Sequence, residues 1–390
     1  MQASLAAQAV SQTNAQVATP AARLHYLDWL RLLAILGVFL YHAVHPFDFT
    51  DWHIKNAELS VTITLILVFF SLWGMPFFFL IAGTGTWFAL RRRTARQYIV
   101  ERSQRLLIPF IAGVILLMPI MLYFEWLHHV RIGEWHDSFL THVLSRRPPL
   151  SPDCFGWAGY HLWFLGFLFS FSLLTLPLFH WLQGTAGQKW LSRLAQRCVA
   201  TGWRPLTGRG GILWFILPLL LVQMLFRPFF PYEHDWADFF VQMSYFVLGY
   251  ILVADPRFAE ALQRDWRIIL TVALVALAIV LASLVWGDPF LWGERPDLPG
   301  FYLVWTVVTV SGWCWCLLVF GWGIGHLKQS NGWLEYGKAA ILPFFMLHQP
   351  VIMVIAYYIA RSGNCYDFGF LLGTGAPFFG ARSGKERGTT

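Results

Sequence analysis

Charged residues are scarce in this chain of 390 residues. Asp, Glu, Lys and Arg together make up 13% of it, whereas 57% is apolar, and Phe (35) and Trp (21) are unusually frequent. Charge this low excludes a typical soluble domain, in which about 25% of residues are charged, and it also excludes a disordered chain. The composition therefore predicts a polytopic membrane protein.

Cysteine is also scarce, and the five cysteines are scattered. Cys314 and Cys316 fall in one apolar run and cannot face each other across one helix, and Cys198 lies in a basic segment. We therefore expect no disulfide framework and no metal site. The net charge of +7 does not require a nucleic-acid partner, because Lys and Arg accumulate in the cytoplasmic loops of membrane proteins.

The first 22 residues contain no charged side chain and are rich in Ala, Gln, Ser and Thr. They lack the basic start and apolar core of a signal peptide, so residues 1–22 are predicted to be a disordered cytoplasmic leader. Residues 23–360 are predicted to form one membrane domain, an all-α bundle of transmembrane helices. No fixed-period repeat is visible in this domain.

Apolar runs long enough to span a bilayer recur along this domain. The second run is long enough to tilt, or to end in a broken turn at "AGTG". The sequence predicts nine clear spans, near residues 27–45, 61–88, 106–127, 161–182, 212–230, 236–254, 268–287, 301–325 and 339–360.

The basic residues alternate between successive loops. The segment "RRRTARQYIVERSQR" holds six arginines against one glutamate, whereas "HPFDFTDWHIKNAE", "PYEHD" and "GDPFLWGERPDLPG" are richer in acid. Lys and Arg are retained on the cytoplasmic side, so the alternation predicts a multi-pass protein of the plasma (inner) membrane with a cytoplasmic amino terminus. The tail at 361–390 has an apolar patch interrupted by four Gly and one Pro. It is expected to be either a degenerate tenth span or a dangling segment.

Two of the ionisable residues in the first predicted span lie on one face of it. Arg31 and His42 are eleven residues apart, close to three helical turns, so both project from one face about 16 Å apart along the axis. Ionisable groups at membrane depth are costly and usually functional. The alternative for His42 is an interfacial histidine bonded to a backbone carbonyl. For Arg31 the alternative is a snorkelling arginine paired with Asp28.

Two further arginines lead into the third span. Arg102 and Arg105 lie one turn apart against the membrane, on one predicted face, and the planar donors of guanidinium groups suit a phosphate. A phosphate-bearing molecule from the cytoplasm is the predicted ligand, and plain positive-inside charge is the alternative.

Four more candidate residues, three polar and one tryptophan, fall at or near membrane depth. His348 sits about 14 Å into the ninth span, and Pro350 frees a backbone carbonyl at that depth. Glu125 is the best-placed carboxylate to orient a histidine, or else a plain interfacial acid. His161 and Trp163, in "HLWFL", are candidates for substrate binding, with an aromatic belt at the outer interface as the alternative.

These residues, taken together, resemble the acyltransferase-3 family of integral membrane acyltransferases. Arg31 and His42 match its arginine–ten residues–histidine motif. The family's second-helix segment is similar to "PFFFLIAGT", except that Ala82–Gly83 stands in place of the usual Ser-Gly. The family's arginine pair before the third helix resembles "ERSQRLLIP". "HLWFL" and "LHQPVI" resemble later segments, so the resemblance covers about residues 23–360. "WHIKNAE" with "HLWFL" is most similar to the branch that succinylates periplasmic osmoregulated glucans.

The resemblance implies about ten spans, a cytoplasmic acyl-CoA donor that acts as co-substrate, and no bound cofactor. The implied acceptor is a carbohydrate hydroxyl on the far side of the membrane, and the implied product is a succinyl or acetyl ester. The resemblance implies that His42 is the catalytic histidine and that Arg31, Arg102 and Arg105 face the donor. Glu125 and His348 are further catalytic candidates because of their own positions in the sequence. From the residues alone, a transporter or flippase of a small anion or glycolipid remains the alternative, because it would also explain buried histidines and arginines at one membrane surface.

Overall fold

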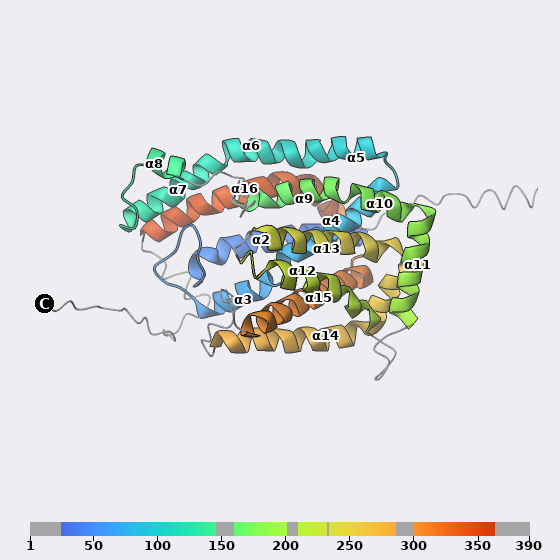
Figure 1. The fold of residues 1–390 in the computed structure, drawn as a ribbon. Coiled ribbons are helices and arrows are strands. Elements are labelled where there is room, and N and C mark those ends of the chain that lie inside the picture. Colours follow the sequence, from blue (N-terminus) through green and yellow to red (C-terminus); the bar gives the residue numbers. More distant parts are fainter. Residues whose placement is uncertain (1–24, 146–159, 201–209, 232–233, 286–298, 363–390) are drawn as a thin grey trace, which may run out of the picture.

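The chain folds as a bundle of helices that run roughly parallel to one another (Figure 1). The computed structural model describes residues 25–145, 160–200, 210–231, 234–285 and 299–362. The predicted leader and most of the predicted tail lie outside these residues. All regular structure in the described part is helical, as predicted.

The described residues from His25 to Leu162 form ten helical segments. They are α2 (His25–Val44), η1 (His45–Phe47), α3 (Val61–Ser71), α4 (Gly74–Leu90), α5 (Ala95–Arg102), the π-helical turn η2 (Ser103–Leu107), α6 (Ile108–Leu116), α7 (Met118–Arg131), α8 (Phe139–Ser145) and η3 (Tyr160–Leu162). The described residues from Trp163 to Ser362 form α9 (Trp163–Leu174), α10 (Leu176–Gln183), α11 (Thr185–Ala200), η4 (Gly211–Phe215), α12 (Ile216–Phe226), α13 (Trp236–Ala254), α14 (Pro256–Val285), α15 (Pro299–His326) and α16 (Gly332–Ser362).

Seven of the helices in the described residues are long and apolar enough to cross a membrane, and an eighth span is formed if α9 and α10, which meet at a 48° bend, are counted as one. The fifth predicted span, near 212–230, is not confirmed. It is a short apolar helix, because α12 has 11 residues and only the 3-10 turn η4 precedes it. The protein is therefore a multi-pass membrane bundle with seven or eight candidate spans.

The second span does not end in a broken turn at "AGTG", which was one of the two outcomes that the sequence left open. The helix is interrupted at Leu72 and Trp73, between α3 and α4, and Ala82 to Gly85 are inside α4. Pro76 explains the position, because it has no N–H to offer the carbonyl of Leu72. The freed Leu72 carbonyl lies against Gly312 of α15.

Glycines allow α4 and α13 to form the most extensive helix pair of the bundle. A Cβ on Gly83 would collide with the backbone carbonyl of Phe246, and a Cβ on Gly249 would collide with that of Leu80. Small residues at such positions let two backbones approach closely, which favours helix association in a membrane. Gly83 in "AGTG" is therefore a packing residue.

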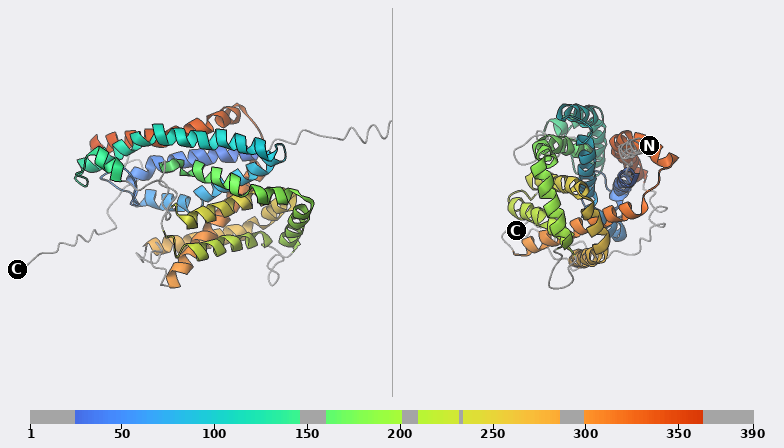
Figure 2. Two further views of the ribbon diagram at one scale, coloured as in Figure 1. Left: turned by 45° about the horizontal axis from the view of Figure 1, so that its top comes forward. Right: turned by 90° about the vertical axis from the view of Figure 1, so that its right-hand side faces the viewer.

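The helices define two ends of the bundle, which matter for the site. The arginine end is where α2 begins, α4 ends and α5 begins, and α11 crosses it roughly at right angles to the other helices (Figures 1 and 2). The loop end is where α2 ends, followed by η1 and residues 48–60. α16 packs on both α2 and α7.

Candidate active site

One face of α2 carries both ionisable residues of the first motif. Leu27, Ile35 and Val38 are buried against the bundle, and Arg31 and His42 continue the same stripe at spacings of three or four residues. In an α-helix these spacings place side chains on one face. Arg31 and His42 therefore both project from the face that packs on the bundle, as predicted.

Three histidines from separate parts of the chain meet beside this face. His42 of α2, His348 of α16 and His161 of η3 form a chain of rings, with centroids 5.2 Å apart between His42 and His348 and 4.9 Å apart between His161 and His348. His348 Nε2 lies 3.2 Å from His42 Nδ1. The sequence singled out each of the three, and the structure brings them together. We call them the histidine trio.

Backbone carbonyls determine which ring nitrogen carries the proton in His42 and His348. His42 Nδ1 lies 3.0 Å from the carbonyl oxygen of Val38, and His348 Nδ1 lies 2.7 Å from that of Phe345. A carbonyl only accepts, so both Nδ1 atoms must be protonated. In the neutral rings His348 Nε2 is then the acceptor for the His42 Nδ1–H, and His42 Nε2 keeps an unshared electron pair.

His161 is held by two backbone carbonyls of α16 that precede Pro350. Its Nε2 lies 3.0 Å from the carbonyl oxygen of Phe345 and 3.3 Å from that of Met346. Met346 is four residues before Pro350, which has no N–H to bond it, so this is the carbonyl that the proline frees. His161 Nε2 is therefore the protonated nitrogen. Its Nδ1 is buried and has no partner among the described residues.

Arg31 lies at the arginine end, roughly 16 Å from His42 along the axis of α2. Its Nη1 donates to Asp28 Oδ1 over 3.2 Å, and its side chain is 37% exposed. The guanidinium occupies the space beside Gly85 of α4, where any Cβ would collide with Nη2. The second glycine of "AGTG" thus makes room for this arginine.

The predicted arginine pair does not share one face. Arg102 Nη2 donates to Thr86 Oγ1 over 3.1 Å, and its guanidinium lies over the ring of Tyr98. Arg105 is 70% exposed and bonds Glu101 over 3.3 Å. The π-helical turn η2 contains Arg105 and follows Arg102 directly, and its wider winding rotates the second arginine away from the first.

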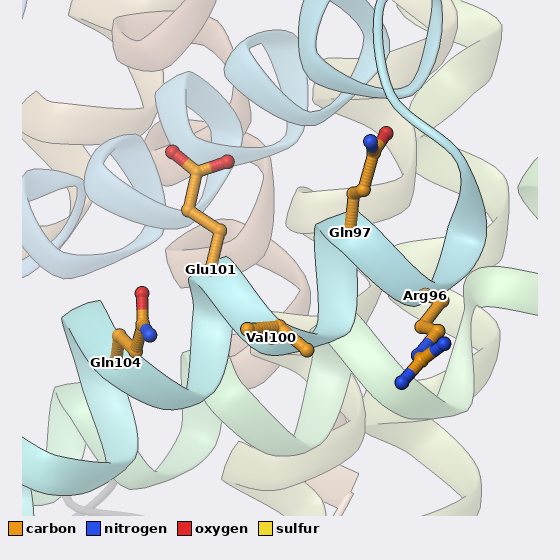
Figure 3. Close-up of a pocket in the computed structure, with 5 residues that line it drawn as sticks. All are labelled: Arg96, Gln97, Val100, Glu101 and Gln104. Atoms are coloured by element: carbon orange, nitrogen blue, oxygen red, sulfur yellow. The ribbon is translucent and has the colours of Figure 1, made fainter.

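Arg105 belongs instead to a group of surface charges. Glu101 also binds Arg93, over 2.7 Å. A shallow hollow at this surface is lined by residues of α5 and η2, with Gln97 and Glu101 pointing to one side and Arg96 to the other (Figure 3). The roles of Arg102 and Arg105 in donor binding remain predictions.

Lys338 is a further cation at the arginine end, one that the sequence analysis did not single out. Its Nζ lies 4.0 Å from Asp28 Oδ2 and 2.5 Å from Glu335 Oε1. Asp28 therefore lies between Lys338 and Arg31. Lys338 lies less than two turns after the start of α16. This position near the beginning of the helix could have indicated from the sequence that Lys338 lies at the arginine end.

Glu125 does orient a histidine, but that histidine is His53, which the sequence did not single out. His53 Nδ1 lies 3.1 Å from Glu125 Oε1, and Tyr160 donates its hydroxyl to Glu125 Oε2. Glu125 is 8% exposed. His53 lies in "WHIKNAE". This segment was noted in the sequence for its family resemblance, but its histidine was not singled out.

Among the described residues, the ring contacts of Trp163 are with side chains outside the histidine trio. Its ring lies 4.4 Å from that of His234 and 5.0 Å from that of Phe167, measured between centroids. It is the first residue of α9, directly after the 3-10 turn that carries His161. Its predicted role in substrate binding remains a prediction.

The loop at residues 48–60 is anchored beside the trio. Asp48 is fully buried and is bonded by His45, Lys55 and Thr50. Burial raises the pKa of this carboxyl, but the hydrogen bonds outweigh it and lower the pKa to about 2. Burial lowers the pKa of Lys55, and Asp48 opposes that change.

Comparison with known proteins identifies the family. Residues 24–379 match the family model described as an acyltransferase domain. The chain belongs to the acyltransferase-3 family. It is similar to proteins named "Glucans biosynthesis protein C" from Salmonella paratyphi A and Salmonella agona, each 23% identical over 374 residues, which are 91% of this chain and 88% of the relative. No solved structure matches the chain.

Proposed function

We propose that the protein is an O-acyltransferase of the plasma (inner) membrane that uses cytoplasmic acyl-CoA. It esterifies a sugar hydroxyl of a periplasmic or cell-surface glucan or other polysaccharide, with a succinyl or acetyl group. The family supports the acyltransferase activity, and the distant similarity to glucans biosynthesis protein C supports the glucan acceptor. In this proposal the arginine end faces the cytoplasm.

The observation that carries the proposal is the free basic nitrogen of His42. Its Nδ1–H is committed to Val38 and His348, so Nε2 is the atom left to act on a substrate. Arg31, on the same helix face, lies about half a bilayer away at the arginine end. One helix thus connects an anion-binding surface with a base at membrane depth.

The proposed donor has the length that this arrangement needs. The phosphates of CoA remain at the cations of the arginine end, Arg31, Arg102 and Lys338, because guanidinium and ammonium groups bind phosphate with charge-assisted hydrogen bonds. The pantetheine arm then carries the thioester about 15 Å inward to His42. Arg105, exposed and bound to Glu101, stands outside this group.

In the reaction, the sugar hydroxyl oxygen bonds the acyl carbon and the C–S bond of the thioester breaks. The hydroxyl gives up its proton to a base, and the sulfur leaves with the electron pair as CoA. His42 Nε2 serves either as that base or as a nucleophile that carries the acyl group for a time.

The test is acyl transfer by the purified protein in proteoliposomes. Acyl-CoA is supplied at the arginine end, CoA thiol release is measured by a chromogenic reagent, and the ester on a β-glucan oligosaccharide is measured by mass spectrometry. We expect His42→Gln to lower both at least about 100-fold, because a general base or nucleophile contributes about 10²–10⁴-fold.

The matched control is His326→Gln. His326 Nδ1 lies 2.9 Å from the carbonyl of Trp322, the same i to i−4 bond that His42 makes, but on α15 and exposed. This variant should keep wild-type activity. Transport of the acyl compound without release of CoA would instead identify a transporter, and more than about a tenth of wild-type turnover in His42→Gln would show that His42 is structural.

A further inference from the structure

A second basic nitrogen lies at the loop end of the site. Glu125 Oε1 fixes His53 Nδ1 over 3.1 Å, and a carboxylate only accepts, so Nδ1 carries the proton. His53 Nε2 therefore keeps an electron pair, and no hydrogen bond from the described residues reaches it. The His53 side chain is 24% exposed, so this nitrogen is within reach of a molecule arriving at the loop end.

Tyr160 completes the group and is held under strain. Its hydroxyl donates to the other carboxylate oxygen of Glu125, and its ring lies 4.5 Å from that of His53. Its φ of 52° is in the left-handed region, which costs a non-glycine residue of the order of 1–3 kcal/mol. Such strain persists where the surrounding structure enforces it, and here it directs the phenol at Glu125.

Two paths connect His53 with the histidine trio. In the first, Tyr160 directly precedes His161 in the chain, and the ring of His161 contacts that of His348. The second is a row of rings: Trp52 lies 5.5 Å from His53 and 5.3 Å from His45, and Tyr41 lies 5.1 Å from His45 and 5.4 Å from His42. The His53 group is therefore continuous with the trio, on the side away from the arginines.

We propose that His53, Glu125 and Tyr160 form the subsite that binds and deprotonates the acceptor hydroxyl, with His53 Nε2 as the base. The proposal rests on the acyltransferase function proposed above and assigns its two steps to two different histidines. His53 would touch the reacting hydroxyl, whereas Glu125 and Tyr160 are positioning residues.

The partners of the two histidines favour this division. His53 is backed by a carboxylate, and a neighbouring negative charge stabilises the imidazolium that a base becomes. His42 is backed by a neutral imidazole and a carbonyl, which give an imidazolium less support. His42 is better suited to attack the thioester, because the resulting acyl-imidazole is neutral once Nδ1 has lost its proton.

The proposed reaction consists of two half-reactions. His42 Nε2 bonds the acyl carbon, the C–S bond breaks, and the thiolate leaves towards the arginine end while the Nδ1 proton moves to His348 Nε2. The acceptor oxygen then bonds the acyl carbon and gives its proton to His53 Nε2. The bond from the acyl carbon to His42 Nε2 breaks, and His348 returns the proton to His42 Nδ1. His53 releases its proton to water, and this proton balances the negative charge of the CoA thiolate released in the first half-reaction.

The test separates the two half-reactions in proteoliposomes. Radiolabelled acyl-CoA is mixed with the protein without acceptor, and CoA release and protein-bound label are measured. A β-glucan oligosaccharide is then added and labelled ester is counted. We expect His53→Gln and Glu125→Gln to keep a stoichiometric burst of CoA release and protein-bound label, but to transfer label to the acceptor at least about 100-fold more slowly.

Tyr160→Phe provides a milder variant that keeps the ring and loses only the hydroxyl. It should keep the burst and slow transfer about tenfold, since it removes a hydrogen bond to a charged group. The control is His129→Gln, which removes another His–Glu pair of α7, with Nδ1 2.5 Å from Glu134 Oε2. It should leave both half-reactions unchanged.

Transfer of label to the acceptor at the wild-type rate by His53→Gln would overturn the proposal. Loss of the burst of CoA release in a folded His53→Gln protein would also overturn it, because that result would place His53 on the donor side. Absence of CoA release and of product with the wild-type protein would instead contradict the proposed function itself.

Discussion

At the scale of single residues, the two arginines before α6 have different surroundings. Arg102 donates to Thr86, which is fully buried and also lies 3.1 Å from the hydroxyl of Tyr98. Arg105 is 70% exposed and shares Glu101 with Arg93. An exposed pair contributes about 0–1 kcal/mol. Only Arg102 is therefore placed to hold a phosphate near Arg31.

This difference leads to a prediction about donor affinity. Arg102→Ala should raise the KM for acyl-CoA about tenfold or more, because a hydrogen bond to a charged group is worth about 1.5–3 kcal/mol and 1.4 kcal/mol is tenfold. Arg105→Ala should change the KM less than about twofold. Initial rates of CoA release at increasing acyl-CoA concentration measure both. Equal effects of the two substitutions would contradict the assignment, and Arg102→Lys should restore part of the affinity.

Residue patterns predicted the parts of the site that lie on single helices. The spacing of Arg31 and His42 placed both on one face of α2, and Pro350 marked the freed carbonyl that His161 reaches. The meeting of three histidines, and the pairing of His53 with Glu125, could not be predicted in the same way. They depend on which helices pack together, and local spacing carries no information about that.

At the scale of elements, the loop after η1 is held by one buried carboxylate. Asp48 accepts from His45 over 2.9 Å and from Lys55 and Thr50, while Lys55 Nζ also donates to the carbonyl of His45 over 2.7 Å. This loop carries His53 and Trp52 to the histidine trio. Its conformation is therefore linked to the ionisation of Asp48.

The stability of the protein should depend on this ionisation. Asp48 has a pKa lowered from 3.8 to about 2, so its contribution is complete above pH 4 and is lost as the pH falls from about 4 to 2. Asp48→Asn should lower the free energy of unfolding by about 2 kcal/mol at pH 7, at about 1.4 kcal/mol per unit of pKa. Thermal unfolding in detergent between pH 2 and 7 measures this difference.

The control for this loop is Asp51→Asn, an exposed carboxylate three residues away. It should change stability by less than about 0.5 kcal/mol at any pH. A difference between wild type and Asp48→Asn that stays constant from pH 7 down to pH 2 would contradict the role given to the Asp48 carboxylate.

Element boundaries were predicted less well than the elements themselves. Apolar runs predicted most spans, but the second span is interrupted at Leu72 and Trp73, before Pro76, and the glycines of "AGTG" are inside α4. A glycine pair signals either a turn or a close helix contact, and only the partner helix decides between them. The run near 212–230 has the composition of a span, but α12 is too short for one.

At the scale of the whole molecule, the segments richest in Lys and Arg gather at one end of the bundle. The start of α5 and the whole of α11 lie at the same end in Figure 1. On α11, Leu191 and Ala195 are buried against the bundle, whereas Lys189 and Arg193 are exposed. Arg257 at the start of α14 donates to Ser192 of α11 over 2.8 Å. The charge alternation of the sequence thus corresponds to two distinct ends.

The last prediction concerns which end faces the cytoplasm. Positively charged segments stay on the cytoplasmic side, so single cysteines should report opposite sides when placed at Arg92, before α5, and at His136, between α7 and α8. The background replaces the five native cysteines by alanine and must retain acyl transfer. In cells with a permeabilised outer membrane and an intact inner membrane, an impermeant maleimide should label His136→Cys at once. Arg92→Cys should react only after the inner membrane is opened. The reverse pattern would place the arginines in the periplasm, away from acyl-CoA, and the donor site at Arg31 and Arg102 would then be wrong even if His42 proved essential.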